Sequence, residues 1–231
     1  TWLAVRSLQT SLPPPGSILV IDNGSSDGSA DGLRRAFSGP SEASSVTVIG
    51  LPENLGFPAG CNVGIESALK AGAEWVFLVN SDVVLAPGTL SELLAEARVR
   101  PSAGIFGPLV LSREEPDAIA SAGITYSAGS GRMLSPLTGR PASHAPTASF
   151  DVTAVSGCAM LIRRAVLEKV GLFDAAYFFF FEDVDLCLRA RAAGFETRCV
   201  PGARVYHEGG RTIGARSARR VYFATRNHLR L

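Results

Sequence analysis

Three short apolar runs constrain the fold of this chain most strongly, because each ends in polar turn residues and leads into a stretch with helical spacing. They occupy residues 18–21, 46–49 and 75–79. Continuous apolar runs of this length are typical of strands that are buried on both faces of a sheet. Strands that alternate with helices predict an α/β fold, with a parallel sheet and crossover helices. Ligands of such sheets bind beyond the carboxyl ends of the strands.

Polar residues stand at these strand ends. Asp22 and Asn23 follow the first strand, and the tripeptide Asn80-Ser81-Asp82 follows the third. Its three oxygen-bearing side chains suit a hard divalent cation, although an Asx turn explains the tripeptide equally simply. His207 ends a later strand-like piece, and a lone histidine is more often structural than a metal ligand. A metal site here therefore requires that Asp82 and His207 meet in space.

Two asparagines after the second strand are further candidates for binding residues. Asn54 lies in the loop that follows this strand, and Asn62 lies at the start of the next helix. Their amide groups suit contacts with a nucleotide or a sugar, or they merely form turns. The sequence leaves both interpretations open.

The stretch from Tyr177 to Arg189 carries the strongest candidate for catalysis. Four consecutive phenylalanines run into Glu182 and Asp183, after which the apolar spacing becomes helical. Burial against aromatic rings raises a carboxyl pKa while a helix N-terminus lowers it, so this pair suits proton transfer. The alternative is that the two acids only cap and charge the first helical turn.

Composition excludes several classes of protein. The chain has 231 residues, 46% hydrophobic and 19% charged, which is too apolar for a disordered protein. Its net charge of +1 argues against general nucleic-acid binding. The segment from residue 203 onward nevertheless holds one glutamate, Glu208, and several arginines, so it is expected to bind phosphate groups or an anionic membrane surface. These arginines are Arg204, Arg211, Arg216, Arg219, Arg220, Arg226 and Arg230.

Local patterns give further expectations. Thr89 to Glu92 matches a capping box that starts a helix. Residues 112–150 predict a long loop region, and residues 152–162 predict a strand. The four cysteines lack C-x-x-C spacing and indicate buried thiols in a reducing compartment, so a cytoplasmic location is expected. The sequence contains no G-x-x-x-x-G-K-[ST], G-x-G-x-x-G, G-x-S-x-G or H-E-x-x-H motif with its required context.

Taken together, these segments resemble the inverting family-2 glycosyltransferases of the GT-A fold, and most of all their bacterial rhamnosyltransferase-like branch. The order and spacing of the matching motifs hold from Ser17 to the end of the chain. The matching segments are residues 20–28, Asn54-Leu55-Gly56-Phe57 with Gly60 and Asn62, Asn80-Ser81-Asp82, residues 155–159, Gly171-Leu172-Phe173-Asp174, residues 181–189 and Val205-Tyr206-His207.

The resemblance implies a nucleotide-diphosphate-sugar donor and a Mg²⁺ or Mn²⁺ ion. By resemblance, Asp82 and His207 hold the metal against the donor diphosphate, and Asp22 with Asn23 recognises the nucleotide base. The catalytic base of the family falls on the pair Glu182 and Asp183, of which Asp183 is favoured. The metal site and Asp183 are expected to share one cleft.

The branch resembled suggests dTDP-rhamnose as the donor and a glycan or lipid-linked acceptor, as in polysaccharide biosynthesis, with peripheral contact at the inner membrane face. Residues 1–111 are expected to bind the donor, and residues 112–231 are expected to bind the acceptor and supply the base, within one continuous domain. Relatives begin with a strand before the helix at the start of this chain, so the first strand of the family's mostly parallel sheet is expected to be missing, with a mixed acceptor-side half.

Two other functions remain open at this point. A glycoside hydrolase would need two carboxyls facing each other across a cleft and no metal. A non-catalytic nucleotide- or sugar-binding fragment would bind the donor without transfer.

Overall fold

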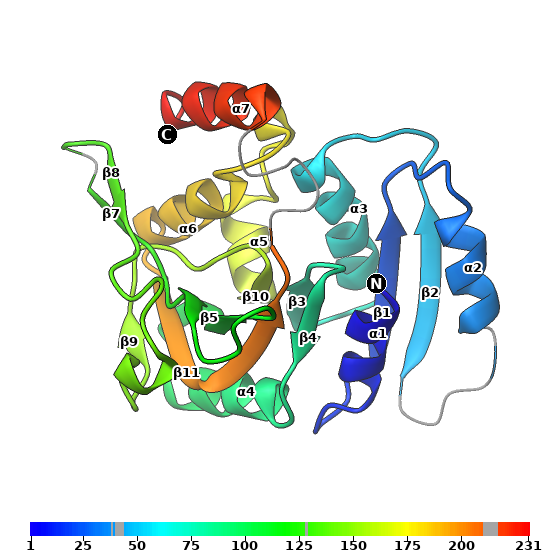
Figure 1. The fold of residues 1–231 in the computed structure, drawn as a ribbon, viewed down its shortest axis with the longest axis horizontal. Helices are drawn as coiled ribbons and strands as arrows, with labels where there is room; N and C mark the ends of the chain where they lie inside the picture. Colours follow the sequence, from blue (N-terminus) through cyan, green and yellow to red (C-terminus); the bar gives the residue numbers. More distant parts are fainter. Residues whose placement is uncertain (38, 40–43, 128, 210–216) are drawn as a thin grey trace.

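The computed structural model describes residues 1–37, 39, 44–127, 129–209 and 217–231 (Figure 1). Two parallel strands, β1 (Ser17–Asp22) and β2 (Ser45–Gly50), form a sheet of their own. Helix α2 (Ser29–Ala36) packs against β2, and α3 (Phe57–Lys70) packs against β1. The strand–helix–strand unit predicted for this part of the chain is confirmed.

A larger, seven-stranded sheet forms the centre of the molecule, in the order β3–β10–β5–β11–β4, with β6 beside β5 and β9 beside β11. Strands β5 and β11 run parallel, whereas β10 runs antiparallel to β3 and β5, and β4 runs antiparallel to β11. Its strands are β3 (Trp75–Val79), β4 (Val83–Leu85), β5 (Ala103–Ser112), β6 (Ile119–Ser121), β9 (Phe150–Asp151), β10 (Ala159–Arg163) and β11 (Glu196–His207).

The α/β class is confirmed, and the larger sheet is mixed, as was expected for the acceptor-side half of the fold. Strand β3 lies at one edge of the larger sheet and pairs with β10, while β1 and β2 form a separate sheet. The apolar β10 lies between β3 and β5. Residues 159–162 of β10 are 0–1% exposed, so this central position removes the strand from water. The mixed sheet joins strands from both expected functional halves, 1–111 and 112–231, and the division between these halves stays a prediction.

Helices cover both faces of the larger sheet. Helix α4 (Thr89–Val99) lies on one face, while α5 (Arg164–Val170) and α6 (Glu182–Ala192) lie on the other (Figure 1). Along β5, Phe106 shares a core cluster with Leu93 of α4, whereas its neighbour Ile105 shares one with Val166 of α5. Each of these fully buried side chains stabilises the fold by about 1.5–3 kcal/mol, so the sheet is a firm platform for the residues at its strand ends.

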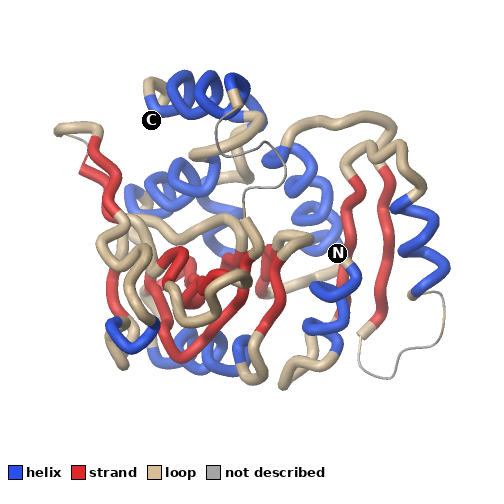
Figure 2. The backbone as a smooth tube through the Cα atoms, viewed as in Figure 1, coloured by secondary structure: helices blue, strands red, loops and turns tan. Residues whose placement is uncertain are grey.

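The remaining elements lie at the edges of this platform (Figure 2). Helix α1 packs against β4, strands β7 and β8 form a hairpin, and α7 lies near the loop that precedes α6. Their bounds are α1 (Trp2–Gln9), β7 (Thr125–Ser127), β8 (Arg132–Leu134), the 3₁₀ helices η1 (Ala142–His144) and η2 (Ala175–Tyr177), and α7 (Ala218–His228). Within the described ranges, none of the helices has the length and apolar character needed to span a bilayer.

Several local expectations need correction. The strand expected over 152–162 is confined to β10, because the chain turns at Ser156–Ala159, where the N–H of Ala159 donates to the carbonyl of Ser156. The expected loop region 112–150 contains three short strands, β6 to β8, and β9 begins at its last residue. The strand-like piece that ends at His207 is the end of a longer strand, β11, which has an irregularity between Val200 and Arg204.

The predicted capping box at Thr89 is also wrong. The N-cap of α4 is Gly88 in a left-handed conformation, and Thr89 is the first helical residue. The Thr89 hydroxyl donates instead to the carbonyls of Ala86 and Arg204, which joins the start of α4 to β11. The four cysteines are free thiols; Cys158, Cys187 and Cys199 are buried, as expected, and Cys61 is only partly buried. Arg211 and Arg216 of the basic segment lie outside the described residues.

Candidate active site

Asp82 and His207 meet where β4 and β11 come together. His207 pairs with Val83 in the antiparallel register, which brings the end of β11 beside the residue before β4. Nε2 of His207 lies 3.3 Å from Oδ1 of Asp82, and the two side chains are 23% and 27% exposed. The hydrogen bond with His207 lowers the pKa of Asp82, against the opposite effect of partial burial. The spatial condition for a shared metal site is therefore met.

The donor atoms of this pair fit a divalent ion. Neighbouring ligands of an octahedral ion at about 2.1 Å lie about 3.0 Å apart, close to the observed separation of Asp82 and His207. No group of three or more His, Cys, Asp or Glu side chains able to hold a metal occurs within the described residues. Ions such as Mg²⁺ bind one or two protein carboxylates and complete their shell with water and substrate phosphates. Asp82 and His207 thus fit an ion that the substrate also ligates.

Asn23 and Asn54 join the loop after β1 to the loop after β2. Nδ2 of Asn23 donates to the carbonyl of Gly56 at 2.9 Å and lies 3.3 Å from Oδ1 of Asn54, and Oδ1 of Asn23 accepts from the N–H of Leu55 at 3.0 Å. Oδ1 of Asn54 accepts from the N–H of Gly56 at 2.9 Å. The observed bonds of both side chains thus fix the loop that starts α3, and their contact with a nucleotide stays a prediction.

Asp22 and Asn62 also have observed partners within the protein. Oδ2 of Asp22 accepts from the N–H of Ser25 at 3.2 Å and forms a turn at the end of β1. The amide of Asn62 donates to the carbonyl of Phe173 at 2.8 Å and accepts from its N–H at 3.1 Å. Both ends of the Asn62 amide are used, so its observed role is to attach α3 to the loop after α5. Donor binding by either residue stays a prediction.

Asp183 lies in the first turn of α6 and is held by two backbone donors. Oδ2 accepts from the N–H of Gly157 and Oδ1 from the N–H of Val184, each at 2.8 Å. Burial raises the pKa of Asp183, and these two N–H groups act in the opposite direction. A carboxylate has about four acceptor sites, so two remain for a substrate hydroxyl.

Glu182 differs from its neighbour in both contacts and position. It is 6% exposed, and its Oε2 has no hydrogen-bond partner within the described residues. Burial, together with the charge of Asp183, raises the pKa of Glu182 to about 8. Two N–H donors stabilise the anion of Asp183, whereas Oε2 of Glu182 has no partner in the described structure, so Asp183 ionises before Glu182.

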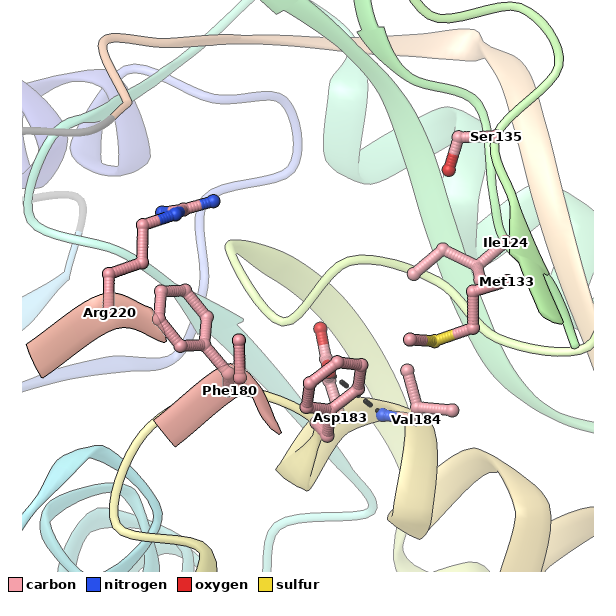
Figure 3. Close-up of a pocket in the computed structure, with 9 residues that line it drawn as sticks. Ile124, Met133, Ser135, Phe180, Asp183, Val184 and Arg220 are labelled. Carbon is pink, nitrogen blue, oxygen red and sulfur yellow. Dashed lines mark hydrogen bonds between the residues drawn. The ribbon is translucent and has the colours of Figure 1, made fainter. Parts of the chain in front are cut away.

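Asp183 opens into a cavity of about 320 Å³. Figure 3 shows it between Phe180 and Arg220 on one side and Ile124 and Met133 on the other, with one carboxylate oxygen directed toward the space between them. The guanidinium of Arg220 lies 4.7 Å from the centre of the Phe180 ring. The described residues that line the cavity are Ile124, Met133, Ser135, Phe180, Phe181, Asp183, Val184, Arg220 and Ala224. The cavity is therefore mostly apolar, with one cation opposite one carboxylate.

Glu182 is absent from the described lining of this cavity. The two adjacent acids therefore do not face each other across it, as the carboxyls of a glycoside hydrolase must.

The segment at Gly157 and Cys158 connects Asp183 with the loop that carries Asp82. Gly157 donates to Asp183, and the carbonyl of Cys158 accepts from the N–H of Asn80 at 2.8 Å, two residues before Asp82. Burial raises the pKa of the Cys158 thiol to about 12, with contributions from the charges of Asp183 and Asp82. Asp82 itself lines a second cavity of about 370 Å³. In the described part of the chain the two carboxylates thus line separate cavities, and one shared cleft stays a prediction.

Sequence reasoning missed Gly157 and the individual role of Arg220. Gly157 leaves room for the carboxylate, because a Cβ there would lie 3.1 Å from Cβ of Asp183. The Ser-Gly-Cys-Ala segment was visible as a motif, but its bond to a residue 26 positions away was not. Arg220 was visible only as one member of a basic segment.

Comparisons with known proteins identify the family of this chain. The family described as "Glycosyltransferase like family 2" matches residues 6–230. N-acetylglucosaminyl-diphospho-decaprenol L-rhamnosyltransferase of Mycobacterium tuberculosis (strain ATCC 25618 / H37Rv) is 32% identical over 241 residues, which covers 92% of this chain and 72% of the relative. Rhamnosyltransferase WbbL of Escherichia coli (strain K12) is 27% identical over 161 residues, which covers 66% of this chain and 60% of the relative.

Two solved structures resemble the fold. The crystal structure of GalNAc-T7 with UDP, GalNAc and Mn²⁺ has a TM-score of 0.65 at 18% identity and covers 88% of this chain and 40% of that chain. Mannosyltransferase PcManGT from Pyrobaculum calidifontis, in complex with GDP-Man and Mn²⁺, has a TM-score of 0.60 at 16% identity, with 97% and 58% covered. At these identities the likeness concerns the GT-A fold alone. With its sequence matched over nearly its whole length, the chain belongs to the family-2 glycosyltransferases, in their rhamnosyltransferase-like branch.

Proposed function

We propose that this chain transfers rhamnose from a nucleotide-diphosphate donor, dTDP-rhamnose, to a hydroxyl of a lipid-linked or other glycan acceptor, with inversion at the anomeric carbon. The relative from Mycobacterium tuberculosis, named for L-rhamnosyl transfer to N-acetylglucosaminyl-diphospho-decaprenol, supports the choice of sugar and acceptor class. The observation that carries the proposal is Asp183, a carboxylate with unused acceptor sites at the edge of an open cavity.

The reaction balances with Asp183 as general base. The acceptor hydroxyl gives its proton to a carboxylate oxygen of Asp183 while its oxygen forms a bond to the anomeric carbon of the donor. The bond from this carbon to the diphosphate oxygen breaks, and the nucleoside diphosphate leaves with the electron pair. Attack from the face opposite the leaving group inverts the anomeric centre.

Asp183 is preferred to Glu182 for three reasons. It lines the cavity, whereas Glu182 is not among the lining residues described. Its anion accepts two backbone N–H groups, and Oε2 of Glu182 has no described partner. With the pKa of Glu182 raised to about 8, Glu182 is mostly protonated at pH 7. A neutral Glu182 also avoids a second negative charge beside the base.

Asp82 and His207 would hold a Mg²⁺ or Mn²⁺ ion, and the fold neighbours named with Mn²⁺ support this part of the proposal. When bound, such an ion neutralises charge that develops on the leaving diphosphate. The positions of Asp82 and His207 on firm strand ends would keep the donor in a fixed orientation. The partial exposure of both side chains leaves access for phosphate oxygens.

The cavity beside Asp183 suits an amphiphilic acceptor. Ile124, Met133 and Val184 supply apolar walls, and Arg220 supplies one cation for a phosphate group. On α7, the exposed Val221 and Tyr222 neighbour arginines, which favours peripheral contact with an anionic membrane at the cytoplasmic face. If so, binding to anionic liposomes weakens as the salt concentration rises, whereas salt-independent binding would contradict this contact.

A donor screen tests the proposed function directly. We expect the protein to transfer sugar from dTDP-rhamnose to a polyprenyl-diphosphate-linked N-acetylglucosamine only in the presence of Mg²⁺ or Mn²⁺, with product detected by mass spectrometry. Transfer from another donor would correct the sugar and keep the reaction class. Metal-dependent binding of dTDP without transfer from any donor would instead indicate a binding fragment.

A further inference from the structure

The phenylalanine segment before α6 has an unusual backbone. Phe178, Phe180 and Phe181 have φ angles of 62°, 71° and 71°, in the left-handed region that favours glycine. Residues with large side chains rarely adopt this conformation, and they keep it only when their surroundings enforce it. The structure identifies two groups of contacts that do so.

The first group comes from α7. Asn227 is fully buried, and its Nδ2 donates to the carbonyls of Tyr177 at 2.9 Å, Phe179 at 2.7 Å and Phe180 at 2.8 Å. An amide nitrogen has two hydrogens, so at least one hydrogen is shared between two carbonyls. Oδ1 of Asn227 accepts from Nε of Arg226 at 2.8 Å, which fixes the orientation of the amide. One side chain thus gathers the carbonyls of the strained segment.

Arg226 extends this set of bonds. Its Nη2 donates to the carbonyls of Ala176 at 2.6 Å and Tyr177 at 2.7 Å. Together Asn227 and Arg226 satisfy four carbonyls of the segment that leads into α6.

The second group comes from the start of α3. The carbonyl of Phe178 accepts from the N–H of Phe57 at 2.8 Å, and Gly56 faces the Phe178 ring so closely that a Cβ would lie 2.7 Å from it. The Phe178 ring also stacks on Phe223 of α7, with centroids 5.2 Å apart and an interplanar angle of 13°. The segment is therefore held between α3 and α7.

The position of Asp183 depends on this segment. Phe181 is the N-cap of α6, and its carbonyl accepts from the N–H of Asp185 at 2.9 Å, so its left-handed conformation sets the direction in which the helix starts. Asp183 follows two residues later, in the first turn. A change in the conformation of residues 178–181 would move the carboxylate relative to the cavity.

We propose that Asn227 is a positioning residue for Asp183: it holds the carbonyls of Tyr177, Phe179 and Phe180 so that α6 starts in the orientation that directs the Asp183 carboxylate into the acceptor cavity. This inference rests on the proposed function, because it assigns Asn227 to the efficiency of proton removal. Asn227 has no place among the residues that line the cavity in the described structure, so its effect is exerted through the segment.

Several ionisable groups lie near Asp183. Glu182 lies beside it on α6, Arg220 faces it from α7, and the thiols of Cys158 and Cys187 are within electrostatic reach. These groups are retained when Asn227 is replaced. A change in the pKa of Asp183 in an Asn227 variant would therefore report a change in its position or hydration.

The experiment compares Asn227→Leu and Asn227→Ser with Ser217→Ala. Leu keeps the branched shape of the side chain, with two larger methyl groups, but removes the donor, whereas Ser keeps one donor and leaves room for water. Ser217 is the N-cap of α7 and accepts from the N–H of Arg220 at 3.2 Å. Ser217→Ala therefore weakens the same helix but leaves the hydrogen bonds of Asn227 in place. The readouts are kcat per folded molecule, the pH profile of kcat/KM, dTDP binding with Mn²⁺, and the Asp183 pKa from carboxyl ¹³C NMR without substrate.

We expect kcat of Asn227→Leu to fall about 100-fold, because misplacement of a catalytic group by 1 Å has an effect of this size. Asn227→Ser should fall less. In both variants the Asp183 pKa and the acidic limb of the pH profile should move to lower pH as the carboxylate becomes hydrated. The dTDP affinity should change less than twofold, and Ser217→Ala should behave as the wild type in all four readouts.

Three outcomes would overturn the proposal: an unchanged kcat and Asp183 pKa in a folded Asn227 variant, equal losses in Ser217→Ala, or failure of both Asn227 variants to fold, which would assign Asn227 to stability alone. Failure of the proposed function looks different. The wild type would then show no transfer with any donor, while the NMR titration would still report whether Asn227 controls the environment of Asp183.

Discussion

The two ends of the candidate active site are built in different ways. Asp82 and His207 are partly exposed, and they meet because β4 and β11 pair in one register. Asp183 is more enclosed, and it lies after a segment whose backbone is held by contacts from α3 and α7. Sheet register is a collective property that single substitutions rarely change, whereas a strained segment depends on a few contacts. The function of the end formed by Asp82 and His207, here called the metal end, should therefore respond to changes in its own residues. The function of the end formed by Asp183, here called the base end, should also respond to changes at distant residues.

The largest expected effect separates the two ends directly. Asp183→Asn removes the proton acceptor but keeps the shape of the side chain, so kcat should fall about 10³-fold. Binding of dTDP with Mn²⁺, measured by isothermal titration, should stay as in the wild type. The exposed Asp31→Asn on α2 serves as a control and should leave both quantities unchanged. Near-normal turnover of Asp183→Asn would show that another group is the base.

The dependence of the base end on distant contacts can be tested at Gly56. This residue has a φ of +86° and faces Phe178, so Gly56→Ala combines backbone strain with a steric clash. We expect the free energy of unfolding to fall by about 3 kcal/mol in urea titrations. Gly72 has a φ of +85° with open space around it, so Gly72→Ala should show the strain alone. Equal losses in the two variants would mean that the contact with Phe178 is unimportant.

The metal end should respond to its own residues. Asp82→Ala or His207→Ala should weaken Mn²⁺-dependent binding of dTDP by at least the 10- to 100-fold that loss of an outer partner typically costs a metal site. Metal-independent binding should remain. His144→Ala, at an exposed histidine, is the matched control. Unaltered metal dependence in both site variants would rule out Asp82 and His207 as ligands.

The smallest expected effect concerns the pH dependence of stability. The pKa of Glu182 rises from 4.5 to about 8 on burial, so the folded state binds more protons than the unfolded state between these values. Stability should therefore fall as pH rises through this window, by about 2 kcal/mol between pH 6 and pH 8.

Glu182→Gln is always neutral and should lose this part of the pH dependence in denaturant titrations. Glu66→Gln, at an exposed glutamate of α3, should retain it. Equal slopes in the wild type and Glu182→Gln would contradict the burial of a protonated Glu182.

The sequence by itself determined the α/β class and the positions of most helices and strands. The apolar runs at 18–21, 46–49 and 75–79 became β1, β2 and β3, because a run of this kind is stable only where both faces are buried. It also indicated Asp82, His207 and Asp183, since polar residues that follow buried strands or start a helix are exceptions to the surrounding pattern. These signals are local, and a local pattern is readable without coordinates.

Only the tertiary structure decided which of these residues lie together. The mixed order of the larger sheet, the contact of Asp82 with His207, and the bond from Gly157 to Asp183 join residues far apart in the chain. Asn227 illustrates the reason. Asn227 lies four residues after Phe223 on the same helix face, and this spacing indicates a buried amide. Its three carbonyl partners, however, lie about 50 residues away in the sequence. Such partners are selected by packing of the whole chain, because a buried amide is stable only where the fold brings acceptors to it.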